Sequence, residues 1–126
     1  MPQFVSASSV LNLVQVWPGS TIVVFDPVAD VLTPPATSRV LCPTDAGGVE
    51  RGAITFDAFW ATTPTASLVI YGSNTPPTSA GPQNGIVLGT LTANGTFTDT
   101  GAHAYYWAYL ASQTAGGALS LTAHVR

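Results

Sequence analysis

Side chains that could do acid–base or metal chemistry are few in this chain and lie far apart in its sequence. The two imidazoles are His103 and His124, and the single thiol is Cys42. His103 could pair with nearby Asp99, whereas His124 falls on the polar side of a predicted strand, where an exposed histidine is the simpler interpretation. Two histidines without a cysteine or carboxylate at ligand spacing do not make a zinc site. The sequence therefore predicts no metal centre.

The carboxylates give no better grounds for an active site. Asp26 and Asp30 flank a proline loop without a third acid at calcium-loop spacing, and Asp45 and Glu50 bracket two glycines in the same way. Acids in such positions usually hydrogen-bond their own backbone in turns. The sequence contains no nucleophile elbow and no glycine-rich phosphate loop, and a lone Cys42 is typical of a small buried hydrophobe. We therefore expect no catalytic residue, no cofactor and no enzymatic activity.

The charge content excludes two classes of partner. Charged residues make up 7 % of the chain, with three arginines, no lysine and six acids, so that the net charge is −3. Three scattered arginines cannot form the basic stripe that nucleic acid requires, nor a polybasic membrane anchor. The apolar stretch from Val10 to Phe25 is broken by Pro18 and Gly19 and is too short to span a bilayer. We expect neither nucleic acid nor a membrane as a partner.

The scarcity of charge also favours a role in an assembly. A monomer of this size exposes roughly 6,300 Å², so the three basic and six acidic residues amount to about one charge per 700 Å². Free soluble proteins carry more charge, which protects their surfaces against association. With 46 % apolar residues the chain should nevertheless fold. We expect a homo-oligomer or a subunit attached to other proteins; a secreted protein that evolved with few charges is the alternative.

Short runs of β-forming residues separated by turn residues fill the chain, and no window has the period of an amphipathic helix. The clearest runs are residues 52–61, 66–71, 86–93, 96–100, 101–112 and 118–125. Residues 10–17, 21–25 and 39–42 are less regular candidates. The sequence predicts one all-β domain over residues 10–126, a single antiparallel, jelly-roll-like β-sandwich of about eight strands. Residues 1–9, which lack a period, are predicted to be an irregular N-terminal arm.

Turn residues predict how these strands pair. Asn94-Gly95 tolerates the positive φ angles of a type I′ turn and predicts a hairpin between its flanking strands, so its match to a glycosylation acceptor is interpreted as a turn. The glycine pair in residues 113–117 predicts a second hairpin, which joins the last strand to residues 101–112. The predicted core includes Ile54, Phe56, Leu68, Ile70, Leu88, Phe97, Leu110, Leu119 and Leu121.

Aromatic residues supply the best candidate for an interaction surface. Tyr105, Trp107 and Tyr109 share one face of a predicted strand, and the opposite face is apolar too. Both faces should therefore be covered, one by the core and the other by a loop of this chain or by another subunit. Such stripes can stack on sugars or anchor protein interfaces. Phe4 and Val5 are further candidates, because a charge-free arm with a small apolar anchor suits docking to a neighbouring subunit.

Four short motifs follow one another in the C-terminal half of the chain. They are Tyr71-Gly72-Ser73-Asn74, Leu88-Gly89-Thr90-Leu91-Thr92-Ala93, Tyr109-Leu110-Ala111 and Gly116-Gly117-Ala118-Leu119-Ser120-Leu121-Thr122. In this order they resemble small β-sandwich structural proteins of tailed bacteriophages, over residues 54–126. The chain departs from that pattern at residues 75–85, where a proline-rich loop replaces an Asp-Gly and a tryptophan, and at Ala111, where the family often has arginine.

The resemblance implies a non-enzymatic component of a virion. The most concrete form of this expectation is a capsid decoration or cement protein, which would bind the major capsid protein or other virion proteins and stabilise the lattice. The alternative is a tail or baseplate module that recognises surface carbohydrate through the aromatic stripe of Tyr105, Trp107 and Tyr109.

Overall fold

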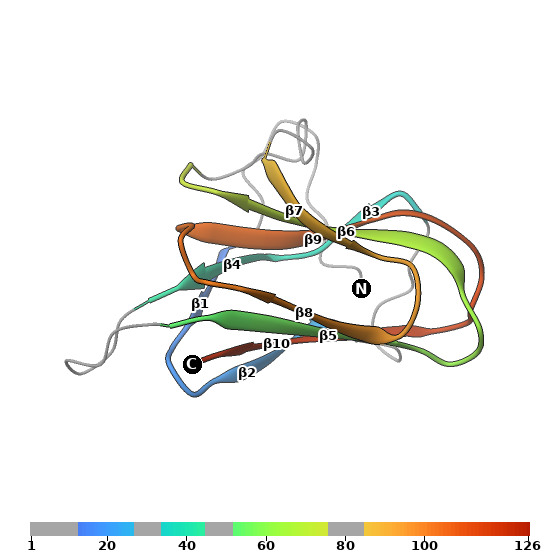
Figure 1. The fold of residues 1–126 in the computed structure, drawn as a ribbon, viewed down its shortest axis with the longest axis horizontal. Helices are drawn as coiled ribbons and strands as arrows, with labels where there is room; N and C mark the ends of the chain where they lie inside the picture. Colours follow the sequence, from blue (N-terminus) through green and yellow to red (C-terminus); the bar gives the residue numbers. More distant parts are fainter. Residues whose placement is uncertain (1–12, 27–33, 45–51, 76–84) are drawn as a thin grey trace.

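The computed structural model describes residues 13–26, 34–44, 52–75 and 85–126, so the predicted arm with Phe4 and Val5 lies outside the described residues. The described chain is all-β, with two sheets and no helix (Figure 1). The sequence predicts about eight strands, whereas the described residues form ten. One reason is that a strand such as β3, with two residues, is too short to show a period. The ten strands are β1 (Leu13–Val16), β2 (Thr21–Phe25), β3 (Ala36–Thr37), β4 (Val40–Pro43), β5 (Ile54–Trp60), β6 (Thr65–Ser73), β7 (Ile86–Leu91), β8 (Gly95–Asp99), β9 (Tyr105–Ala115) and β10 (Leu119–Val125).

The strands form a six-stranded and a four-stranded sheet, which Figure 1 shows as two layers. The first has the order β1-β4-β9-β6-β7, with β3 beside β9, and the second has the order β2-β10-β5-β8. All pairs are antiparallel except β1 with β4, which is parallel. Most consecutive strands alternate between the sheets; only β3 to β4 and β6 to β7 stay within one.

Both predicted hairpins are wrong, because each turn carries the chain from one sheet to the other. β7 pairs with β6 and β8 with β5, while β9 and β10 belong to different sheets. Gly95 does not adopt the positive φ of a type I′ turn. Instead, Asn94 Oδ1 accepts a hydrogen bond from the Trp60 backbone N–H at 2.7 Å, and Asn94 Nδ2 lies 3.5 Å from the Trp60 carbonyl oxygen. The Asn94 amide thus bonds to the backbone of Trp60 as a neighbouring strand would, and it holds the connection between β7 and β8 at the end of β5.

The core lies between the sheets and takes side chains from both. Alternation in β5 and β10 turns every second residue inward, as expected for strands with one buried face. Among the predicted core residues, Leu88 and Phe97 pack at the rim and the others are buried. The buried members of the prediction are Ile54, Phe56, Leu68, Ile70, Leu110, Leu119 and Leu121. The prediction of the core is therefore confirmed for these seven residues, Leu88 and Phe97 are only partly buried, and the predicted strand pairing is wrong.

Candidate functional site

Asp99 is bound into the connection between β8 and β9. Its Oδ2 accepts hydrogen bonds from the Tyr106 hydroxyl at 2.5 Å and from the Gly101 backbone N–H at 3.0 Å. The backbone N–H of His103 donates to the same Tyr106 hydroxyl at 3.1 Å, and the imidazole ring lies edge-on to the Tyr106 ring, 5.7 Å between centroids. Through these bonds the Asp99 carboxylate holds the connection between β8 and β9 against the core.

The second histidine and the cysteine lie elsewhere in the fold. His124 is half-buried on the outer face of the four-stranded sheet, where its Nδ1 is 2.8 Å from the Thr21 hydroxyl. Cys42 is a free, half-buried thiol in β4, more accessible than the predicted small hydrophobe of the interior. In the part of the chain that the structure describes, no three histidine, cysteine or acidic side chains are grouped so as to hold a metal ion. The same residues include no helix that is long and apolar enough to cross a membrane.

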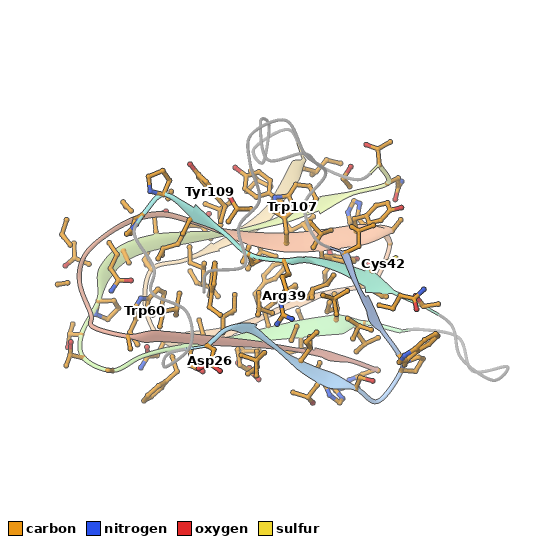
Figure 2. All side chains as sticks on the ribbon, turned by 180° about the vertical axis from the view of Figure 1, so that it is seen from behind. Asp26, Arg39, Cys42, Trp60, Trp107 and Tyr109 are labelled. Carbon is orange, nitrogen blue, oxygen red and sulfur yellow. The ribbon has the colours of Figure 1, made fainter. Side chains whose placement is uncertain are left out.

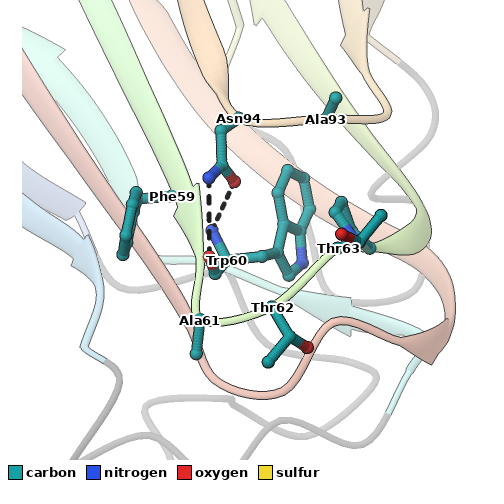
Figure 3. A pocket seen from close by; sticks show the side chains of 8 residues that line it. Phe59, Trp60, Ala61, Thr62, Thr63, Ala93 and Asn94 are labelled. Atoms are coloured by element: carbon teal, nitrogen blue, oxygen red, sulfur yellow. Dashed lines mark hydrogen bonds between the residues drawn. The ribbon is translucent and has the colours of Figure 1, made fainter.

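An open depression of about 490 Å³ lies where β5 leads into β6 and β7 leads into β8 (Figure 3). Its walls are formed by Phe59, Trp60, Ala61, Thr62, Thr63, Pro64, Ala93 and Asn94. The Phe59 ring is 61 % exposed, and the Asn94 amide is already bonded to the backbone of Trp60. None of the lining side chains carries a titratable group. The depression can therefore offer ring, methyl and hydroxyl contacts but no group for proton transfer.

The predicted aromatic stripe lies on the outer face of the six-stranded sheet, away from the core (Figure 2). The Trp107 ring stacks on Tyr71, with centroids 5.5 Å apart and an interplanar angle of 9°. Tyr109 meets Tyr71 edge-on at 6.4 Å. Burial, and secondarily the neighbouring Tyr109, raise the pKa of Tyr71 above its ordinary value of 10.0. We call this group the outer aromatic cluster: Val40, Val69, Tyr71, Tyr105, Trp107 and Tyr109.

Trp107 is fully buried within this single chain, with 0 % of its surface exposed. The atoms that exclude water from the indole therefore belong to the chain itself. Gly85 is one contributor, because it lies so close to the indole that no side chain would fit there. The aromatic face was expected to be covered either by a loop of this chain or by another subunit, and the burial of Trp107 favours the chain itself. Trp107 is thus unavailable to a sugar or partner, whereas Tyr105 and Tyr109 are only half-buried and keep some exposed surface.

The outer face of the four-stranded sheet has the opposite chemistry. Hydroxyl side chains dominate it, and they bond across the strands: Thr55 and Thr98 are 3.1 Å apart, and the Thr96 hydroxyl donates to Asp57 Oδ1 at 2.7 Å. The side chains on this face are Thr21, Val23, Thr55, Asp57, Phe59, Thr96, Thr98, Ser120, Thr122 and His124. The molecule therefore presents one aromatic and one hydroxyl-rich face.

The sheet edges are almost free of charge. β1 and β7 end the six-stranded sheet, and β2 and β8 end the four-stranded sheet. The single charged residue in these four strands is Asp99, at the end of β8 and bonded to Tyr106. Edge strands in soluble proteins are commonly protected by charged side chains. Leu13, Ile86 and Val87, on the edges of the six-stranded sheet, are also exposed large apolar residues. These edges and Tyr105 and Tyr109 are the best candidates for contact with partners.

The sequence pattern placed the stripe correctly but missed the residues that complete the site. Tyr71 was visible as part of the strand at 66–71, but its contact with Trp107 depends on the pairing of β6 with β9. The sequence marks Asn94 only as a turn residue, and nothing in it indicates the bond to the Trp60 backbone. No local pattern marks Gly85 as a neighbour of the indole.

Comparison with known proteins adds no family to these observations. No protein-family model, curated protein or solved structure matches this chain.

Proposed function

We propose that this chain is a non-enzymatic structural component of a bacteriophage particle, a capsid decoration or cement protein that binds the lattice of the major capsid protein and stabilises it. The strand order carries the proposal. The orders β2-β10-β5-β8 and β4-β9-β6-β7 are those of an eight-stranded jelly-roll sandwich, to which β1 and β3 are additions. Jelly rolls are common in viral capsid and lectin domains. Together with the resemblance of residues 54–126 to phage structural proteins, this order favours a place in the virion.

The chemistry of the surface supports residence in an assembly. The four edge strands carry one charged residue, and large apolar side chains stay exposed beside them. On a free monomer such edges invite association. A subunit that is built into a particle can bury them against its neighbours, so that charge is not needed for their protection.

The two outer faces suggest how the subunit sits on the lattice. The hydroxyls of the four-stranded sheet bond to one another, as between Thr55 and Thr98, and such a face is well suited to water. The opposite face carries Tyr105 and Tyr109, and tyrosine is enriched at the energetic centres of protein interfaces. The proposed docking surface is therefore the part of the aromatic face that stays accessible, around Tyr105 and Tyr109, and the hydroxyl-rich face points to solvent.

Particle composition and particle stability test this function together. Particles purified from the host that produces this chain should contain it in copy numbers comparable with the major capsid protein, measured from stained gel bands. Particles from a strain that lacks the chain should release their DNA at a lower temperature. A handful of copies per particle, or unchanged heat release, would rule out the decoration role.

One observation favours the second candidate, a tail or baseplate module that binds carbohydrate. The Phe59 ring, 61 % exposed, lines the depression together with Thr62 and Thr63, and a ring with hydroxyls is suited to a neutral sugar. The stripe itself is a poorer sugar site because Trp107 is buried. On an array of neutral glycans, a sugar module should bind and the Phe59→Ala variant should not. Tyr109→Ala serves as the matched control.

A further inference from the structure

Of the four edge strands in the described part of the chain, β8 is the longest one without a bulge. β2 contains a bulge at Val24 and β7 one at Leu88, since the pairing of each strand shifts by one residue there. The Val23 carbonyl of β2 also accepts a hydrogen bond from Arg39, which reaches over from the six-stranded sheet (Figure 2). β1 is only four residues long. Bulges and short length both discourage an edge from pairing with another chain.

β8, in contrast, keeps a regular register with β5 over all five of its residues. Within the described residues β5 is its one partner, so its other side is an edge. Its Thr96 and Thr98 are exposed on the outer face, while Phe97 points towards the core rim. The carboxylate of Asp99 is turned inward to Tyr106. No charged side chain therefore projects from this edge to repel a second strand.

We infer that β8 pairs antiparallel with β8 of a second copy of this chain, around a two-fold axis at Phe97. The two four-stranded sheets would then form one continuous sheet of eight strands. The sequence of β8, Gly-Thr-Phe-Thr-Asp, reads almost the same from either end. Around the axis each Thr96 faces Thr98 of the second copy, and each Asp99 faces Gly95 of the second copy.

This arrangement joins groups that suit one another. Threonine pairs across antiparallel strands are favourable, and Thr98 already makes one with Thr55 at 3.1 Å. The two Asp99 residues lie at opposite ends of the new pair, about 14 Å apart along the strands. Repulsion between them is therefore weak. A two-fold contact needs such a self-complementary patch.

The neighbouring edge of the other sheet, β7, is uncharged as well. β7 lies close to β8, because Gly89 packs directly against the Phe97 ring. Ile86 and Val87 of β7 are 60 % and 56 % exposed. No side chain of β7 is charged, so this neighbouring edge would not repel a second copy that approaches β8. The contact is a property of the isolated protein and does not depend on the proposed place in a virion.

Register-specific disulfides test the pairing. In a Cys42→Ala background, one chain carries Thr96→Cys and another Thr98→Cys. Directly opposed residues in antiparallel strands have Cα atoms about 4.5–5.5 Å apart, within the range of a disulfide. Two cysteines of the same type are two residues out of register and too far apart. We expect a covalent dimer on oxidation of the mixture and none from either variant alone. Crosslinking in all three samples, or in none, would contradict the two-fold pairing.

Charged substitutions on β8 provide the second test, and the mixture of oppositely charged variants checks that they fold. Thr96→Lys with Thr98→Lys places like charges opposite one another and should weaken dimerisation by about tenfold or more, measured by sedimentation equilibrium. Thr96→Glu with Thr98→Glu should do the same, and a mixture of the two variants should recover a heterodimer. The matched control is Thr21→Lys with Val23→Lys on β2, which should stay dimeric. A monomeric wild type, or equal loss in the β2 control, would overturn the proposal.

Discussion

The hydroxyl of Tyr106, in β9, donates to Asp99 Oδ2, in β8, over 2.5 Å and so joins the two sheets where the chain crosses between them. The Tyr106 side chain is fully buried and packs near Phe56, with ring centroids 6.4 Å apart. The same carboxylate fixes Gly101, whose φ of +89° favours glycine. One pair of side chains therefore links the two sheets and holds the connection between them.

Replacement of Tyr106 by phenylalanine tests this bond. The ring still fills the core, but the carboxylate loses a donor, and hydrogen bonds to charged groups contribute about 1.5–3 kcal/mol. We expect the free energy of unfolding in urea to fall by about that amount. Tyr105→Phe removes a hydroxyl from the half-buried outer face and should change it by less than about 0.5 kcal/mol. Equal effects of the two variants would show that the Tyr106–Asp99 bond has no special role.

Gly95→Ala distinguishes the observed crossing from a hairpin. Gly95 has no positive φ, and an added Cβ would meet its nearest atoms at 3.9 and 4.0 Å, which is ordinary contact. We expect a change in stability within about 0.5 kcal/mol. A type I′ turn would instead require positive φ and make the substitution costly. Gly101→Ala is the control, because its φ of +89° and its closeness to Gly52 leave no room for a methyl group. A large loss at Gly95 would favour the hairpin.

The strands and the core could be predicted because both depend on a local period. In β5 the buried and exposed residues alternate along the sequence, and Ile54 and Phe56 can be assigned to the core without knowledge of any other strand. The predicted pairing failed because a turn sequence specifies a reversal and not a partner. Asn94 and Gly95 allow a tight turn in either topology. The contact that selects the crossing joins Asn94 to Trp60, which lies 34 positions earlier.

The candidate site, like the fold, could be predicted only in part from the sequence. Alternation in β9 was enough to place Tyr105, Trp107 and Tyr109 on one face. Whether that face is open depends on groups from other segments, namely Tyr71 in β6 and Gly85 before β7. Their approach to Trp107 follows from sheet order and register, which the residue pattern of a single strand does not contain.

Alkaline titration should reveal the environment of Tyr71. Its pKa is raised first by burial and then by Tyr109. Above pH 10.0 the unfolded chain loses this proton first, while the folded chain retains it, so the folded state loses stability as the pH rises through the folded pKa. The difference between wild-type and Tyr71→Phe tyrosinate absorbance should have a midpoint above pH 10.0. Tyr109→Phe should lower that midpoint, but by less than the amount by which burial raises it. A midpoint at or below the ordinary value would contradict burial of this hydroxyl.

Tryptophan fluorescence tests whether the isolated chain covers its own outer aromatic cluster. Trp17 is 42 % exposed, whereas Trp60 and Trp107 are 1 % and 0 % exposed. Acrylamide quenches indoles that it can reach, so Trp17 should account for most of the quenching in the wild type. The Trp17→Phe variant should emit at shorter wavelength and resist quenching, and further replacement of Trp60 by phenylalanine leaves Trp107 as the single reporter. If Trp107 in that double variant is quenched as readily as Trp17, and near-ultraviolet dichroism shows that the variant is folded, then the cover over Trp107 must come from a partner and not from this chain.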